Sequence, residues 1–409
     1  MNIDMPQTGA SAVDAKNRAA ACIFICMGLI VFGSVPIVSS SLPAPTLSFF
    51  ETSPGWQMMG RLFLGLVVAG AIVLTASLDT DRGPQKLARY GGFILVAALL
   101  TDIHYHTVDV VHLHWQTDQY DRVLLHTDQA PDQYRFLPQG ILWWMILGNG
   151  DFIFSYLLYR FFFTLLVCKF AYDLARHFLT SSQAFIVVLL YALFYPLSTR
   201  YYSGNLLDPM THAAILAALI CCRRQQAGVA LAVFVLGMFI KETMFLIFPC
   251  YYLMNLDTFR LRDPRRLGQL ALFGAVGILV FFACRIPFHF HYDFQSLNRT
   301  SGLMVYSNLG IPGAWIDSAV PVYQRILHPI LFLFMWLPLI VWKRKWLPRP
   351  LFWTAIYLAA SFYAINLCFG WNYESRNFIP PLIFLLICTL IILTRLTEAE
   401  PPGKSQPPS

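Results

Sequence analysis

Long apolar runs separated by short polar segments make up most of the 409-residue chain. A helix needs about 20 apolar residues to cross a bilayer, and several runs approach that length. The longer runs are 20–39, 62–78, a run from Gly91, 152–169, 268–284, 326–342, 351–369 and 379–393; the shorter ones are 139–147, 184–197, 209–222, 228–240 and 243–253. The pattern predicts an all-α fold, a polytopic transmembrane helical bundle of roughly 10–12 spans.

Composition supports this class. The chain is 57% hydrophobic and 12% charged, with a mean hydropathy of +0.56. A soluble domain would carry about twice that charged fraction. The formal charge of +7 does not indicate nucleic-acid binding, because the basic residues form small clusters between apolar runs, as in the cytoplasmic loops of membrane proteins. The nine cysteines lie mostly within apolar runs and show no metal-binding spacing.

These basic clusters predict the organisation of the chain. Residues 1–19 form a disordered cytoplasmic N-terminus, 20–90 two transmembrane helices, 91–395 a transmembrane core, and 396–409 a disordered cytoplasmic tail. The polar segment 102–138 is then the first large outer loop, with interfacial helices. The compact loops and the lack of organelle signals favour a multi-pass protein of the bacterial plasma membrane (inner membrane), with an extracytoplasmic active face.

The stretch Trp115–Pro138 is the most polar segment between two apolar ones and carries four aspartates and two arginines. Asp118 and Asp121 fit a helix lying in the interface plane, where a carboxylate could serve as a general base. Arg135 could orient the loop or bind a phosphate through two hydrogen bonds. The alternative is a solvated loop whose aspartates only maintain solubility.

A second polar feature is Lys241–Glu242, between two apolar runs that are each too short for a comfortable span. We predict a short hairpin with these residues at its outer tip, because charge at membrane depth is costly and usually functional. Lys241, Arg200 and Arg376 are candidates to hold an anionic lipid phosphate, since all three fall at the outer ends of predicted spans. Glu242 and Glu374 complete this candidate binding set.

A metal site is a weaker hypothesis. Asp102, His106 and Asp109 recur near helical spacing, and both residue types ligate divalent cations. A polar interfacial helix explains the same pattern. A divalent cation is therefore the one cofactor that the sequence leaves open.

Three local motifs resemble the GT-C superfamily of integral-membrane glycosyltransferases. They are Asp118-x-Tyr120 followed by Tyr134-Arg135-Phe136-Leu137-Pro138, the turn Lys241-Glu242-Thr243, and the segment Tyr373-Glu374-Ser375-Arg376-Asn377-Phe378-Ile379-Pro380. With the hydropathy pattern, the likeness covers about residues 90–395.

The resemblance implies a GT-C-like core and inverting transfer of a sugar from a polyprenyl-phosphate donor at the extracytoplasmic face. Asp118 matches the family's base best and Asp121 second, while Lys241, Arg200 and Arg376 would hold the donor phosphate. The implied partners are the lipid bilayer, the lipid-linked sugar donor and a glycan, lipid or protein acceptor, with no nucleic acid. Two other classes stay open: a multi-span transporter or flippase of lipid-linked or anionic substrates, and a non-catalytic membrane scaffold.

Overall fold

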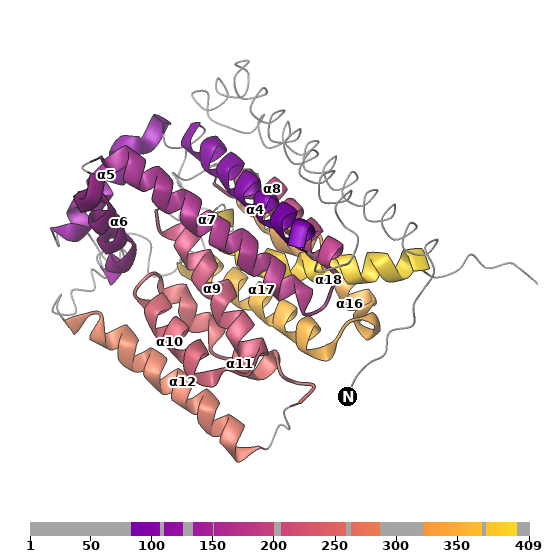
Figure 1. Cartoon of the computed structure of the whole chain (residues 1–409). Coiled ribbons are helices and arrows are strands. Elements are labelled where there is room, and N and C mark those ends of the chain that lie inside the picture. The colour runs from indigo at the N-terminus through magenta and orange to yellow at the C-terminus, as the bar shows by residue number, and fades with distance from the viewer. Residues whose placement is uncertain are drawn as a thin grey trace, which may run out of the picture.

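The computed structural model describes residues 83–106, 110–125, 134–149, 151–199, 206–258, 263–286, 322–369 and 374–398. Helices account for 87% of these residues, and they contain no strand, which confirms the all-α prediction. In chain order the elements are α4 (Gly83–His104), α5 (Val110–Leu124), α6 (Phe136–Asn149), α7 (Phe152–Arg176), α8 (Ser181–Thr199), α9 (Leu207–Arg223), α10 (Ala227–Met238), η3 (Glu242–Ile247), α11 (Cys250–Leu253), α12 (Pro264–Ala283), α15 (Val322–Pro329), η5 (Ile330–Phe334), α16 (Leu337–Trp342), η6 (Arg344–Trp346), α17 (Arg349–Phe369), η7 (Ser375–Phe378) and α18 (Ile379–Glu398) (Figure 1).

Five helical stretches in the described part of the chain are long and apolar enough to cross a membrane. They are Phe152–Arg176, Arg266–Ala283, Arg325–Trp342, Arg349–Cys368 and Ser375–Thr397. Three shorter apolar helices accompany them: Phe136–Gly148, Ser181–Pro196 and Ala227–Met238. The predicted spans 20–39 and 62–78 and the N-terminal segment 1–19 lie outside the described residues. The total of 10–12 spans therefore stays a prediction.

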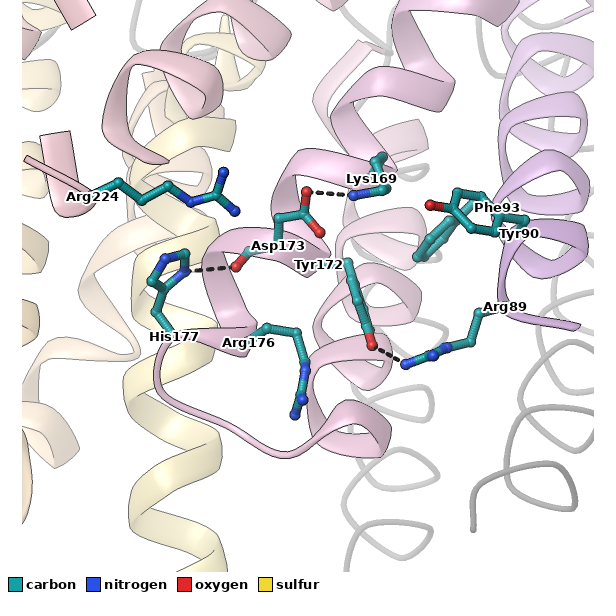
Figure 2. A pocket seen from close by; sticks show the side chains of 9 residues that line it. All are labelled: Arg89, Tyr90, Phe93, Lys169, Tyr172, Asp173, Arg176, His177 and Arg224. Carbon is teal, nitrogen blue, oxygen red and sulfur yellow. Dashed lines mark hydrogen bonds and ion pairs between the residues drawn. The ribbon is translucent and has the colours of Figure 1, made fainter. Parts of the chain in front are cut away.

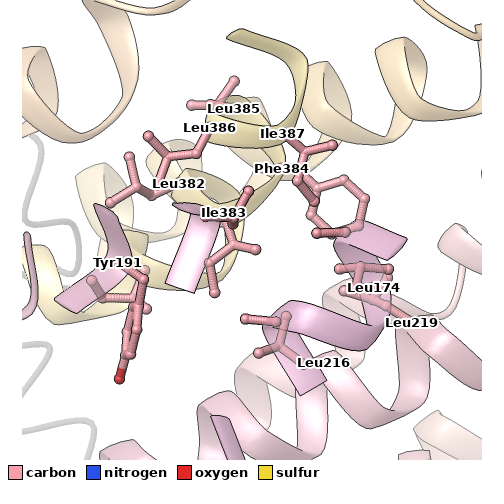
Figure 3. Packing of buried hydrophobic residues seen from close by; sticks show 14 of the residues in the cluster. Leu174, Tyr191, Leu216, Leu219, Leu382, Ile383, Phe384, Leu385, Leu386 and Ile387 are labelled. Atoms are coloured by element: carbon pink, nitrogen blue, oxygen red, sulfur yellow. The ribbon is translucent and has the colours of Figure 1, made fainter. Parts of the chain in front are cut away.

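The last helix, α18, forms the centre of the bundle. Of its spanning window, 89% is buried inside the protein, the largest share among the five candidates. Residues 382–387 of α18 pack near Leu174 of α7, Tyr191 of α8, and Leu216 and Leu219 of α9 (Figure 3). A helix with neighbours on all sides must be apolar all round, as this one is. It extends to Glu398, slightly into the predicted tail, and the Pro401–Pro402 pair follows soon after.

Helix α12 is the least buried of the five candidate spans. Only 17% of its spanning window is buried, and Figure 1 shows it at the outer edge of the molecule, beyond α10. Leu272, Ile278, Leu279 and Phe282 are exposed, which suits a helix that faces lipid on most of its surface. On its inner side, a Cβ added to Gly277 would lie 2.8 Å from Phe234 Cζ and 2.9 Å from Phe245 Cε2. The missing side chain lets α12 pack closely against this pair of rings.

The described residues form the predicted hairpin around Lys241–Glu242, while the outward direction of its tip stays a prediction. Arg223 pairs with Asp257 at 3.1 Å, and Gln225 donates a hydrogen bond to Thr258. The turn between α9 and α10 therefore lies beside the end of the returning limb, with Lys241 at the far turn. The returning limb is not one continuous helix but η3 followed by the short α11, and Pro249 stands between them.

Helices α5 and α6 cover one end of the bundle. Val110–Leu124 is helical, in line with a helix in the outer segment. Helix α6 has 14 residues, so its length of about 21 Å is short of the roughly 30 Å hydrocarbon core. Its Leu142 is buried while Trp143, Trp144 and Leu147 are exposed, an arrangement that suits apolar contact with lipid.

Candidate functional site: a buried polar cluster at one end of the bundle

Arg135 and Glu242 form the first half of the cluster. The Nε and Nη2 atoms of Arg135 donate to Glu242 Oε2 at 3.1 and 2.9 Å. Arg285, which follows α12, places Nη2 3.8 Å from the other oxygen, Oε1. The Arg285 guanidinium also lies 4.5 Å from the centre of the Tyr134 ring, a cation–π distance. One carboxylate thus joins the start of α6, the hairpin turn and the end of α12.

Asp208 is the centre of the second half. Lys241 Nζ lies 3.7 Å from Asp208 Oδ1, and Arg376 Nη1 lies 3.4 Å from Oδ2. Arg376 Nη2 is 3.4 Å from Glu374 Oε2. Lys241 Nζ also donates to Asn377 Oδ1 at 2.6 Å. Since Lys241 and Glu242 are neighbours in the chain, the two halves form one polar cluster, defined here as Arg135, Asp208, Lys241, Glu242, Arg285, Glu374, Arg376 and Asn377.

Interruptions in the helices position these side chains. Lys241 is extended (φ −160°, ψ 137°), so the chain leaves α10 and re-enters as η3 with Glu242 in its first turn. Glu374 precedes the 3₁₀ turn η7, which carries Arg376 into the start of α18. The His212 ring contacts the Arg376 carbonyl oxygen through Nε2 at 2.9 Å, which ties η7 to α9. Backbone that leaves the helical ladder needs protein partners where water is excluded, and Lys241, Ser375 and Arg376 are buried in protein.

The cluster is largely buried and carries more cations than carboxylates. Asp208, Arg285 and Arg376 are 1%, 2% and 5% exposed. Four cations face three carboxylates, which leaves a formal charge of +1 among these described residues. The buried Arg160 of α7 lies within electrostatic reach of Asp208 and bonds to the Tyr156 and Tyr195 hydroxyls at 3.0–3.2 Å. Such a concentration of positive charge favours an anionic ligand.

The hairpin turn, outside the five candidate spans, shows how burial and charge compete. Burial alone would raise the pKa of the Glu242 carboxyl, but Arg135 and Arg285 outweigh it, so this pKa lies below its ordinary value. Burial lowers the pKa of the Lys241 ammonium, and the negative charge of Asp208 offsets only part of that effect. Glu242 is thus held ionised beside a lysine that is less basic than usual.

Two buried carboxylate oxygens in the cluster lack a hydrogen-bond donor among the described residues, and we call them open. Asp208 Oδ2 and Glu242 Oε1 are buried and accept no hydrogen bond within the described structure, although each lies near an arginine nitrogen. Buried oxygens normally have a hydrogen-bond donor, so each such atom calls for an explanation. A bound ligand that carries hydroxyl groups would supply the missing donors.

The structure brings together five of the eight site residues predicted from sequence: Arg135, Lys241, Glu242, Glu374 and Arg376. Asp118 and Asp121 lie on α5 with exposed side chains and contact none of the cluster residues through a described ion pair. Tyr120, which lies between them in sequence, is buried, and its ring packs edge-to-face against the ring of Phe152. Arg200 lies outside the described residues.

The metal hypothesis has limited geometric support. Asp102 and His106 approach within 3.4 Å, but both side chains are at least half exposed, and Asp109 lies outside the described residues. No group of three or more His, Cys, Asp or Glu side chains in the described ranges could hold a metal ion.

Three members of the cluster were not among the site residues predicted from sequence: Asp208, Arg285 and Asn377. Asp208 and Arg285 each stand at the end of a long apolar run, and a charge in that position is the sequence signal that could have identified them. Asn377 is uncharged and gave no comparable signal. Its amide contacts both Asn366 and Glu374, so it links α17 to η7.

No family model, no curated protein and no solved structure matches this chain.

Proposed function

We propose that this membrane protein is a glycosyltransferase that moves a sugar from a polyprenyl-phosphate donor to an acceptor at the outer face. The observation that carries the proposal is the buried polar cluster, which combines an excess of cations with two open carboxylate oxygens. Cations bind phosphate through charge-assisted hydrogen bonds, and carboxylate oxygens accept hydrogen bonds from sugar hydroxyls. A lipid-linked sugar phosphate carries both kinds of group.

The surroundings of the cluster suit a donor with a lipid tail. Helix α6 begins directly after Arg135 and exposes Trp143, Trp144 and Leu147. A lipid chain could lie along this apolar surface while its phosphate reaches the arginines and Lys241. Aromatic side chains at such an interface also suit the boundary between acyl chains and head groups.

Asp118 is the proposed general base. Although burial alone would raise them, nearby cations hold the pKa of Asp208 and that of Glu242 below their ordinary values, which makes these two carboxylates poor proton acceptors. Asp118 is exposed on α5, the helix that packs against α6, and so is open to an acceptor hydroxyl. Asp121, exposed one helical turn further along α5, is the second candidate.

The test uses the full-length protein in nanodiscs with a radiolabelled polyprenyl-phosphate hexose and a mixture of cell-envelope acceptors. We expect label to move into an acceptor product, and glycans from a deletion strain to lack the corresponding mass. Accumulation of the intact donor on the far side of sealed vesicles, without any covalent product, would instead establish a flippase. An unchanged set of glycans, lipids and glycoproteins in the deletion strain would overturn the transferase.

A further inference from the structure

A polar pocket lies beside the C-terminal end of α7, and none of its lining residues belongs to the buried polar cluster. It has a volume of about 490 Å³ and is lined by Arg89, Tyr90, Phe93, Lys169, Tyr172, Asp173, Arg176, His177 and Arg224 (Figure 2). On α7 the nearest lining residue, Lys169, lies nine residues beyond Arg160, the residue within electrostatic reach of Asp208; this is about 14 Å along a helix at about 1.5 Å per residue. The pocket is therefore separate from the proposed transferase site.

Positive charge dominates this pocket. Four of the lining side chains are Lys or Arg, and one is a carboxylate, so its formal charge is +3 with His177 neutral. The cations come from three parts of the chain: Arg89 lies on α4, Lys169 and Arg176 lie on α7, and Arg224 directly follows α9. Basic residues are common at a cytoplasmic membrane face, but that tendency does not by itself make them converge on one cavity.

Hydrogen bonds hold three of the cations in place, and one of these bonds runs from Arg176 Nη1 to the Leu179 carbonyl oxygen at 3.2 Å. Arg89 Nη1 donates to the Tyr172 hydroxyl at 2.6 Å and to Ser181 Oγ at 3.1 Å. Lys169 pairs with Asp173 one turn along α7, and the Asp173 carbonyl oxygen contacts His177 Nδ1 at 2.8 Å. These contacts reduce the entropy that the side chains lose when a ligand binds.

The shape and lining favour a small anion with an apolar portion. Tyr90 and Phe93 form an aromatic side to the pocket, opposite the charged residues of α7 (Figure 2). Arg224 is exposed, so its guanidinium group can turn toward a ligand. Arg176 is also exposed, and it keeps donor atoms beyond the Nη1 that bonds to Leu179. A phosphate group matches several convergent guanidinium groups better than a single carboxylate does, because its oxygens accept bonds from more than one of them.

We infer that this pocket binds a phosphate-bearing ligand, either a lipid head group of the adjacent leaflet or a soluble phosphate compound. The inference does not depend on the proposed transferase activity. Both sources share the phosphate chemistry, and the experiment separates them.

The test uses the full-length protein in zwitterionic nanodiscs. One arm adds phosphatidylglycerol at rising mole fraction and counts retained lipids by native mass spectrometry. The other arm titrates inorganic phosphate and follows it by calorimetry. Binding in the first arm alone identifies a lipid head group, whereas binding of inorganic phosphate in the second identifies a soluble phosphate source.

The variants are Arg224→Gln and Arg176→Gln, with Lys345→Gln as the matched control. Lys345 is exposed in η6 and does not line the pocket. Removing one charge-assisted hydrogen bond should weaken binding about tenfold, and the double variant more. Lys345→Gln should stay within about twofold, since exposed charges act weakly at a distance. Failure of both probes to bind the wild type, or equal losses in the pocket variants and the control, would overturn the inference.

Discussion

Arg135 and Glu242, 107 residues apart in the chain, meet through two guanidinium nitrogens that donate to a single carboxylate oxygen. Both side chains are mostly buried, at 16% and 22% exposure. The pair fastens the beginning of α6 to the turn of the α10–η3 hairpin. It therefore connects the segment after α5 to the buried polar cluster.

Breaking this pair from one side should destabilise the fold. Arg135→Gln leaves Glu242 with Arg285 at 3.8 Å as its remaining described cation, and should cost about 3 kcal/mol in the free energy of unfolding. The measurement is unfolding in mixed micelles titrated with SDS. In Arg135→Gln/Glu242→Gln neither side chain is charged, so the double variant should lose less than the sum of the singles. Strict additivity would show that the two residues do not interact.

The same pair predicts a pH dependence. Because the pKa of Glu242 lies below its ordinary value in the folded protein, its ion pair contributes fully above the unfolded carboxyl pKa of about 4.3. This contribution is lost as the pH falls through the lower folded value. Thermal melts from pH 7 to 3 should therefore show a loss of stability below about pH 4 that is smaller in Glu242→Gln. An identical acid profile in both proteins would contradict the assignment.

Asp208 should matter more for stability than Lys241 does. Asp208→Asn removes the carboxylate shared by Lys241 and Arg376, whereas Lys241→Met leaves Asp208 paired with Arg376 at 3.4 Å. We expect losses of about 4 kcal/mol for Asp208→Asn and about 2 kcal/mol for Lys241→Met. The two variants can be ranked in the same SDS titration. The reverse order would mean that Asp208 is not the centre of this half of the cluster.

Asp118 should affect chemistry without affecting folding. Its side chain is exposed, so Asp118→Asn should leave the melting temperature unchanged and lower sugar transfer by at least about 100-fold, as expected for loss of a general base. Asp151→Asn is the matched control at the start of α7, because asparagine caps a helix about as well as aspartate does. Full transfer activity in Asp118→Asn would move the role to Asp121, to be tested by Asp121→Asn.

Two glycines one turn apart on α12 provide a packing test. A Cβ at Gly277 would fall within 2.9 Å of two aromatic rings, whereas at Gly274 the nearest atom is Phe248 Cε2 at 3.9 Å. Gly274→Ala should be neutral or stabilising by up to about 1 kcal/mol through helix propensity. Gly277→Ala should be destabilising by about 1–2 kcal/mol, because overpacking outweighs that gain. Equal effects would show that α12 does not pack this closely on the hairpin.

The pattern of apolar and polar residues was enough to predict a membrane protein, its helical content and the hairpin around Lys241–Glu242. Apolar runs and basic clusters carry this information because the bilayer imposes it on each segment separately. It also marked five of the residues that meet in the cluster, since charge near a long apolar run is costly enough to stand out. The GT-C-like identity and the catalytic role of Asp118 stay proposals.

Which of these charges meet depends on how the helices pack in three dimensions. Arg135 and Glu242 pair, and Asp208 lies between Lys241 and Arg376, while Asp118 on α5 is exposed to solvent or lipid. Hydropathy places a residue near one end of a span but does not fix the rotation or the neighbours of its helix. Those depend on packing around α18 and on the turns at Lys241 and η7, where the helical ladder is interrupted. The same packing also assembled the basic pocket beside the C-terminal end of α7. In the sequence its cations are three arginines and a lysine that lie far apart along the chain.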